Sequence, residues 1–150
     1  MLSSIFQSSS LPVLEQVVNF TESRHGVLAG NIANMDTPGY KTRDLSPALF
    51  QERLKEAIET KRQPATPNYN FDPFETSPTQ NTQNQQAREM AAFRKVEDSM
   101  KSILRHDEGD VSMEEQVNEI VKNQQQHNLA IGIMSAQFRL LRAAITERVA

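Results

Sequence analysis

The sequence contains no cysteine and no tryptophan, and it has only two tyrosines. Without cysteine, disulfides, thiolate metal sites and cysteine nucleophiles are all excluded. Apolar residues make up 37% of the 150 positions and aromatic residues 6%. A domain with a thick hydrophobic core normally contains more apolar material. The composition therefore favours an elongated protein over a compact sphere.

Neither acidic nor basic residues are in large excess. The net charge is −3, and the sequence has no cluster of lysine and arginine, so we expect no nucleic-acid partner. No run of about 18 apolar residues is present, so we expect no direct membrane insertion. The N-terminus, MLSSIFQSSS, lacks the basic and apolar regions of a secretory signal. If the protein leaves the cytoplasm, we expect it to do so without a cleaved signal.

The N-terminal segment carries a heptad stripe, because its members are spaced by four and three residues in turn. This spacing predicts a helix of about 25 residues, with Ser10 as its N-cap and Pro12 in its first turn. Thr37-Pro38-Gly39 is expected to end the helix. The stripe comprises Leu14, Val18, Thr21, His25, Leu28, Ile32 and Met35.

The C-terminal segment carries a longer stripe of the same spacing, which predicts a helix from about residue 112 to 148. Ser112 and Glu115 are expected to form a capping box at its start. A helix of this length is typical of a coiled coil. Its stripe comprises Met113, Val117, Ile120, Gln124, His127, Ile131, Met134, Phe138, Leu141 and Ile145.

A second stripe lies beside the first on each predicted helix. One stripe per helix can pair the two terminal helices, which leaves the second for neighbouring subunits. Alternatively, the middle of the chain folds back over it. The second stripes comprise Val13, Val17, Phe20, Arg24 and Val27 near the N-terminus, and Leu129, Ile133, Ala136, Leu140 and Ala144 near the C-terminus.

The middle of the chain has weaker signals. Short helices are predicted from Ser46 to about Thr60 and from about Ala87 to Arg105, separated by an extended or flexible stretch rich in Pro, Asn, Gln and Thr at 63–86. We predict an all-α, elongated fold whose long terminal helices pair as an antiparallel coiled coil. Residues 1–44 and 107–150 would form the terminal-helix rod domain. Residues 45–106 would form a variable, partly disordered middle segment containing one or two shorter helices.

Motifs for catalysis and cofactor binding are missing, including a nucleophile elbow, a P-loop, a dinucleotide-binding glycine loop and a zinc-protease motif. His25 and His127 fall on the predicted stripes, where a histidine is typically a polar layer of a coiled coil. The two could face each other, but two imidazoles without a carboxylate make a poor metal site. We therefore expect no catalytic, cofactor or metal site, no small-molecule substrate and no enzymatic activity.

Residues 28–40, LAGNIANMDTPGY, form the most specific motif. They closely resemble the N-terminal signature of the flagellar rod, hook and hook-associated family, which has Asn-Leu/Ile-Ala-Asn followed by Thr-Pro-Gly-Tyr. Residues 109–117 and 138–145 also resemble the family's last helix. The resemblance implies an assembly motif made of Leu28, Asn31, Ile32, Asn34, Thr37, Pro38, Gly39 and Tyr40.

The motif also has a physical interpretation. Asn31 and Asn34 lie near a helix end, where they can bond free carbonyls or a neighbouring chain. Small residues, among them Gly30, allow another helix to approach closely. Tyr40 supplies a rigid anchor with one polar tip.

The short length and the sequence YKTRD at 40–44 make the chain most similar to the proximal rod members of the family. The resemblance implies a structural subunit of the bacterial flagellar basal body, exported through the flagellar type III apparatus into the periplasmic rod. Its implied partners are copies of itself, other rod proteins, and junction proteins of the membrane ring and export gate. The sequence departs from the family at 108–111, and nothing is carried over to 63–105.

Two other functions remain open from the sequence. A cytoplasmic coiled-coil adaptor or export chaperone would share the apolar stripes, but it has no need of the motif at 31–40. An enzyme would need a cleft formed by residues 45–105, because two long helices do not supply one.

Overall fold

The computed structural model describes residues 9–62, 79–100, 103–104 and 112–147. Contacts divide the chain into two units, Met1–Leu45 with Ser102–Ala150, and Ser46–Lys101. The described residues are mostly helical, which confirms the predicted fold class. In chain order, the elements are α2 (Leu11–Ala33), β1 (Arg43–Asp44), α3 (Pro47–Arg62), α4 (Thr79–Asp98), β2 (Ile103–Leu104) and α5 (Met113–Glu147).

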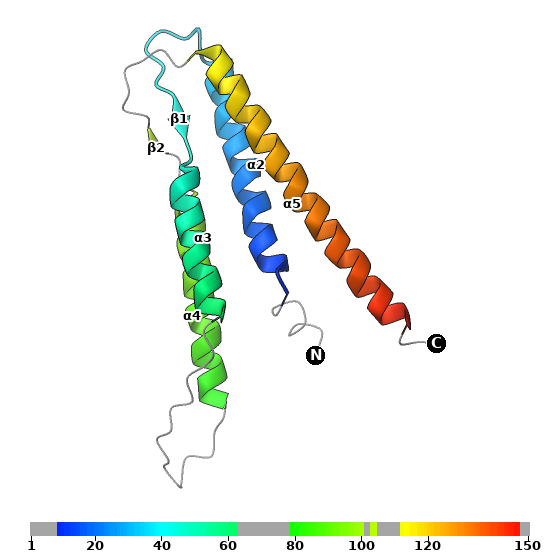
Figure 1. Cartoon of the computed structure of the whole chain (residues 1–150). Helices are drawn as coiled ribbons and strands as arrows, with labels where there is room; N and C mark the ends of the chain where they lie inside the picture. The colour runs from blue at the N-terminus through cyan, green and yellow to red at the C-terminus, as the bar shows by residue number, and fades with distance from the viewer. Residues whose placement is uncertain (1–8, 63–78, 101–102, 105–111, 148–150) are drawn as a thin grey trace. The chain divides into compact units, whose positions relative to one another are not determined.

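The first unit is built on α2 and α5, which lie side by side (Figure 1). Asn31, near the end of α2, bonds to Gln116 near the start of α5, whereas Ser10, just before α2, bonds to Gln137. The two helices are therefore antiparallel, as predicted. Because α5 has 35 residues and α2 has 23, α5 continues beyond the start of α2. Because Gln137 contacts Ser10, the overhang consists of residues 138–147, which at about 1.5 Å per residue is roughly 15 Å long.

The start of α2 differs from the prediction in its capping. Ser10 occupies the N-cap position and Pro12 lies in the first turn, but the Ser10 side chain makes no capping hydrogen bond. The Leu11 N–H instead donates to Ser9 Oγ at 3.2 Å. Ser10 Oγ accepts a hydrogen bond from Gln137 Nε2. Ser10 thus takes the predicted N-cap position, but its hydroxyl contacts α5 and does not cap α2.

The start of α5 forms the predicted capping contact. The Glu115 N–H donates to Ser112 Oγ at 3.3 Å. Glu114 and Glu115 lie in the first turn, where negative charge stabilises the free N–H end of a helix. No proline interrupts the 35 residues that follow.

A two-stranded antiparallel pairing, which the sequence did not predict, completes the first unit. Arg43 pairs with Leu104, and Asp44 pairs with Ile103. The predicted helix from Ala87 to Arg105 is therefore too long, because α4 ends at Asp98. A two-residue strand carries too little periodicity to be visible in a sequence.

The second unit consists of α3 and α4 packed side by side (Figure 1). Its buried apolar residues are Phe50, Ala57, Ala92 and Val96. Ser46 Oγ accepts a hydrogen bond from the Leu49 N–H at 3.3 Å, which caps the start of α3. Helix α4 begins at Thr79, so residues 79–86 are helical and not extended as predicted. Pro78 is the last proline of that stretch, and residues 63–78 lie outside the described part of the chain.

Candidate assembly site

The interface between α2 and α5 buries several polar side chains beside its apolar ones. Asn123 Nδ2 donates to the main-chain carbonyl of Thr21 at 2.7 Å, and Thr21 Oγ1 lies 2.9 Å from His127 Nδ1. These directional bonds hold the two helices in one register, because sliding either helix would break them together. The buried polar residues of this unit are Gln16, Thr21, Arg24, Asn31, Gln116 and Asn123.

On α5, the buried and half-buried side chains form a heptad stripe adjacent to the predicted one. This inner stripe comprises Gln116, Ile120, Asn123, His127, Ala130, Met134, Gln137 and Leu141. It shares alternate positions with the predicted stripe: Ile120, His127, Met134 and Leu141. The remaining apolar members of the predicted stripe are exposed: Met113, Val117, Ile131, Phe138 and Ile145.

On α2, the buried face also combines members of both predicted stripes. Leu28 and Thr21 of the first stripe and Phe20 and Arg24 of the second are buried. Leu14, Val18 and Ile32 are half-buried. His25 is exposed, so His127 lies against Thr21 and not against His25.

A buried arginine joins α2, β1 and α5. Arg24 Nε and Nη2 donate to the two carboxylate oxygens of Asp44 at 3.0 and 2.9 Å, and Nη2 also donates to Glu119 Oε2 at 2.8 Å. Lys122 Nζ lies 2.8 Å from the other Glu119 oxygen. This cluster ties the segment that follows α2 to the beginning of α5. Paired, bidentate geometry is what allows an arginine to be buried.

Each charge in this cluster stabilises its partners. Burial lowers the pKa of Arg24, but hydrogen bonds to Asp44 and Glu119 outweigh it, so the net pKa is raised. Hydrogen bonds from Lys122 and then from Arg24 lower the pKa of Glu119. Both groups therefore stay ionised at neutral pH.

Asn31 organises the chain that follows α2. Its Nδ2 donates to the Arg43 carbonyl at 2.7 Å, and its Oδ1 accepts from the Arg43 N–H at 3.1 Å and from the Tyr40 hydroxyl at 3.2 Å. Nδ2 also lies 3.3 Å from Gln116 Oε1 on α5. One buried amide thus satisfies main-chain groups and holds the tyrosine and β1 against α2. The sequence placed Asn31 at a helix end but gave no signal for these partners.

The rest of the motif forms a helix stop and a tight turn. Asn34 Nδ2 donates to the Gly30 carbonyl at 2.8 Å, as expected for an amide at a helix end. The Tyr40 N–H donates to the Thr37 carbonyl at 3.1 Å. Gly39 lies between them with φ of +75°, which is the position of a type II turn that needs glycine after proline. Residues 36–41 are exposed, so the structure presents a rigid turn at the surface.

The most exposed apolar surface lies on α5. Leu140 is 71% exposed and Leu129 is 65% exposed. Both belong to the second predicted stripe of α5, here called the far stripe: Leu129, Ile133, Ala136, Leu140 and Ala144. All except half-buried Ala136 are exposed. From Leu129 onward, α5 therefore carries apolar side chains around its whole circumference, which is typical of a helix covered on all sides.

By length and hydropathy, the segment Met113–Thr146 could also cross a membrane. This finding departs from the expectation drawn from the lack of a continuous apolar run. The core helix of a soluble assembly passes the same test, so the measure does not choose between lipid and protein as the covering material.

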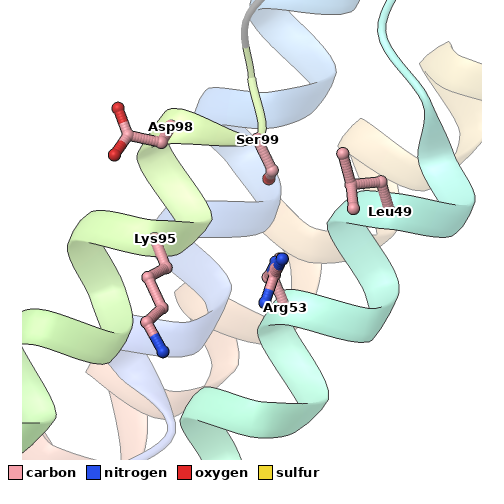
Figure 2. Close-up of a pocket in the computed structure, with 5 residues that line it drawn as sticks. All are labelled: Leu49, Arg53, Lys95, Asp98 and Ser99. Carbon is pink, nitrogen blue, oxygen red and sulfur yellow. The ribbon is translucent and has the colours of Figure 1, made fainter.

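The second unit has a surface hollow between α3 and α4. Figure 2 shows Leu49 and Arg53 on α3, Lys95 and Asp98 on α4, and Ser99 directly after α4, around this hollow. Glu56 pairs with both cations, because its carboxylate oxygens lie 3.1 Å from Lys95 Nζ and 3.1 Å from Arg53 Nη1. Hydrogen bonds from Lys95 and then Arg53 lower the pKa of Glu56. Within the residues that the structure describes, no three His, Asp or Glu side chains could together hold a metal ion.

In the described part of the chain, the surfaces that stand out are the exposed faces of α5 and the turn at residues 36–41. A comparison with protein families matches residues 23–41 to the flagella basal body rod proteins. This range contains Arg24, Asn31 and the turn. No solved structure matches the chain.

Comparison with individual related proteins narrows the family to which the chain belongs. The chain is 34% identical to "Flagellar basal body rod protein FlgB" of Aquifex aeolicus over 113 residues, covering 73% of this chain and 70% of the relative. It is 39% identical over 54 residues to the FlgB protein of Escherichia coli (strain K12), covering 36% and 37% of the two chains. The FlgB protein of Yersinia enterocolitica is 36% identical over 52 residues.

The fold and the motif thus define a helical flagellar rod protein. More narrowly, the chain belongs to the FlgB family of flagellar basal body rod proteins. It is accordingly a structural component of the flagellar basal body, with a role in motility.

Proposed function

We propose that the chain is a subunit of the proximal rod that assembles by packing its helices against copies of itself and against other rod proteins. Export through the flagellar type III apparatus delivers it to the periplasmic part of the rod, where it meets the junction of the membrane ring and export gate. It has no catalytic activity. Its mechanism is mechanical: helix contacts transmit torque.

The exposed far stripe of α5 is the observation that carries this proposal. Large aliphatic side chains at Leu129, Ile133 and Leu140 face outward while the chain pairs α2 with α5 through hydrogen bonds. Burying one such side chain contributes about 1.5–3 kcal/mol. A surface of this kind is typical of a protein contact. In the rod, neighbouring subunits cover this apolar surface.

The rigid turn supports the same role. Asn31 fixes Tyr40 and the main chain of Arg43, so the exposed residues 36–41 are held in a defined orientation. A preorganised surface loses little conformational entropy when a neighbour binds. The motif therefore supplies a second contact, at the end of the helix pair opposite to the α5 overhang.

The test is the incorporation of far-stripe variants into purified basal bodies. Leu129→Ser and Leu140→Ser should leave the helicity and melting temperature of the free protein nearly unchanged, because both side chains are exposed. They should reduce incorporation and motility at least tenfold. Gln125→Ser, an exposed polar position on the same helix, is the matched control and should incorporate normally.

Normal incorporation of both serine variants would contradict the proposal. Recovery of the wild-type chain only from the cytosol would instead favour the adaptor or chaperone function.

A further inference from the structure

Asn31 and Arg24, about two turns apart on α2, hold the chain that follows the turn in the same way. In each residue, one nitrogen atom that carries two hydrogens contacts two separate segments. Asn31 Nδ2 donates to the Arg43 carbonyl at 2.7 Å and to Gln116 Oε1 on α5 at 3.3 Å. Residues 40–45, here called the return segment, are therefore joined to α5 through Asn31.

Arg24 repeats this arrangement as a second anchor. Its Nη2 donates to Asp44 Oδ2 at 2.9 Å and to Glu119 Oε2 on α5 at 2.8 Å. Asp44 Oδ1 also accepts a hydrogen bond from the Leu45 N–H at 2.8 Å. The arginine thus fixes the end of the return segment, where Leu45 is buried.

The two acceptors on α5 set the direction of both anchors. Gln116 and Glu119 are three residues apart, so they are neighbours on the surface of the helix. The other oxygen of Glu119 lies 2.8 Å from Lys122 Nζ, which orients the carboxylate. Amide and guanidinium groups are planar, and the hydrogens on one nitrogen point in fixed directions. An acceptor on α5 that fixes one hydrogen therefore also fixes where the other meets the return segment.

Burial makes this coupling strong. Arg24 is 4% exposed and Asn31 is 1% exposed. Both bond directly to α5, so without α5 water would compete for the same hydrogens. An exposed ion pair contributes little, whereas a buried bidentate pair holds its partner firmly. The anchors therefore hold the return segment firmly only while the start of α5 is packed against α2.

We propose that Gln116 and Glu119 are positioning residues for the turn at 36–41 and form a latch between α5 and the return segment. With the latch closed, the turn keeps one orientation, which it loses when α5 is not packed against α2. A chain offers this contact to a neighbour only after its own α5 is in place. The inference deepens the proposed assembly role and rests on it for the use of the turn, but the latch is a property of one chain.

Amide exchange in the full chain tests the latch. The Arg43 N–H, which donates to Asn31, and the Leu45 N–H, which donates to the adjacent carboxylate, report on the two anchors and are here called the anchor amides. The amides of residues 120–126 report on α5. A series from urea to the osmolyte trimethylamine N-oxide varies how fully α5 is packed. In the wild type, both sets of amides should gain protection at the same point of this series.

Removal of both acceptors should separate the two signals. In the double variant Gln116→Ala with Glu119→Ala, the anchor amides should exchange at least tenfold faster under conditions in which the α5 amides stay protected. Asn123→Ala is the matched control, because it removes the bond from α5 to the Thr21 carbonyl and touches neither anchor. It should shift both sets of amides together.

Two substitutions at one position distinguish bonding from the filling of space. Glu119→Gln keeps an acceptor oxygen for Arg24, so exchange at the Leu45 amide should stay within about threefold of the wild type. Glu119→Met fills a similar space without an acceptor and should speed exchange there at least tenfold. Equal exchange in these two variants would show that shape, and not the hydrogen bond, holds the segment.

Two further results would overturn the proposal. The first is a wild-type chain in which the two sets of amides gain protection at different points of the series. The second is an equal response of the anchor amides to the double alanine variant and to Asn123→Ala. Either result leaves the assembly role standing, because that role is measured by incorporation of far-stripe variants into basal bodies.

Incorporation supplies the second measurement of the latch. The double alanine variant should enter purified basal bodies at least tenfold less than the wild type, whereas Glu119→Gln should enter normally. Normal entry of the double alanine variant would show that assembly does not need the latch.

Discussion

The side-chain amide of Asn123 donates to the main-chain carbonyl of Thr21 across the α2–α5 interface, at 2.7 Å. The asparagine is only 1% exposed. Within the described residues, its own carbonyl oxygen and that of buried Gln16 have no hydrogen-bond partner. The direction of this bond, more than apolar contact at Asn123, therefore fixes how the two helices pair at this level.

Loss of this bond should weaken the helix pair. Asn123→Ala removes a buried hydrogen bond, and we expect the free energy of unfolding to fall by about 1–2 kcal/mol. Chemical denaturation followed by circular dichroism measures the change. The adjacent Gln124→Ala, at an exposed position, should change stability by less than about 0.5 kcal/mol. Equal effects at the two positions would show that the polar interface does not hold the helices.

Asn31 and Asn34 should differ strongly despite their similar context. Asn31→Ala leaves the N–H and carbonyl of Arg43 without their side-chain partner, at a cost of about 1–3 kcal/mol. It should also increase amide exchange at residues 40–44. Asn34→Ala loses one bond to the Gly30 carbonyl at a half-buried site, and should cost about 0.5–1 kcal/mol. Unchanged exchange at 40–44 in Asn31→Ala would contradict the anchoring role.

The arginine cluster should make the first unit sensitive to acid. Hydrogen bonds from Lys122 and Arg24 lower the pKa of Glu119 in the folded chain. As the pH falls, the unfolded chain therefore binds a proton at Glu119 at a higher pH than the folded chain does. This carboxylate contributes its full stability above the ordinary glutamate pKa of about 4.3, and loses it as the pH drops through the lower folded value. Glu119→Gln should reduce the dependence of unfolding free energy on pH below about pH 5.

Two glycines within residues 28–40 should respond oppositely to alanine. Gly39 has φ of +75°, so Gly39→Ala should destabilise the turn by about 1–2 kcal/mol. Gly30 lies inside α2, and a Cβ there would meet no atom within 4 Å. Gly30→Ala should therefore stabilise the free chain by about 0.5–1 kcal/mol. If a neighbouring helix packs closely at Gly30, the same variant should incorporate poorly into basal bodies.

Helix positions were predictable because long periodic segments leave a strong pattern. The starts of α3 and α5 follow from Ser46 and Ser112, whose hydroxyls accept from the N–H three residues later. The antiparallel pairing of the terminal helices also followed from their matched stripes. The extent of α4 was not predictable, because polar residues without apolar periodicity carry no helix signal.

The side of α5 that faces α2 could not be predicted from periodicity. The predicted stripe and the inner stripe share Ile120 and Met134 and differ by a small rotation about the helix axis. Hydrophobicity favours the stripe with Ile131 and Phe138, but the structure buries the neighbouring one, with Asn123. That choice depends on contacts between distant segments. The one sequence signal of a polar interface was Arg24, which lies within an apolar stripe of the segment that forms α2.

The polar α2–α5 interface has a consequence for temperature. Separating surfaces joined mainly by hydrogen bonds changes the heat capacity little, because that change follows apolar area. Covering the aliphatic faces of α5 changes it much more. In the rod assembly proposed above, chilling should thus weaken the contacts of these exposed faces more than the helix pair, which buries Phe20 and Leu28 but is also joined by hydrogen bonds. A cold-disassembled rod would release chains that are still folded internally and ready to associate again on warming.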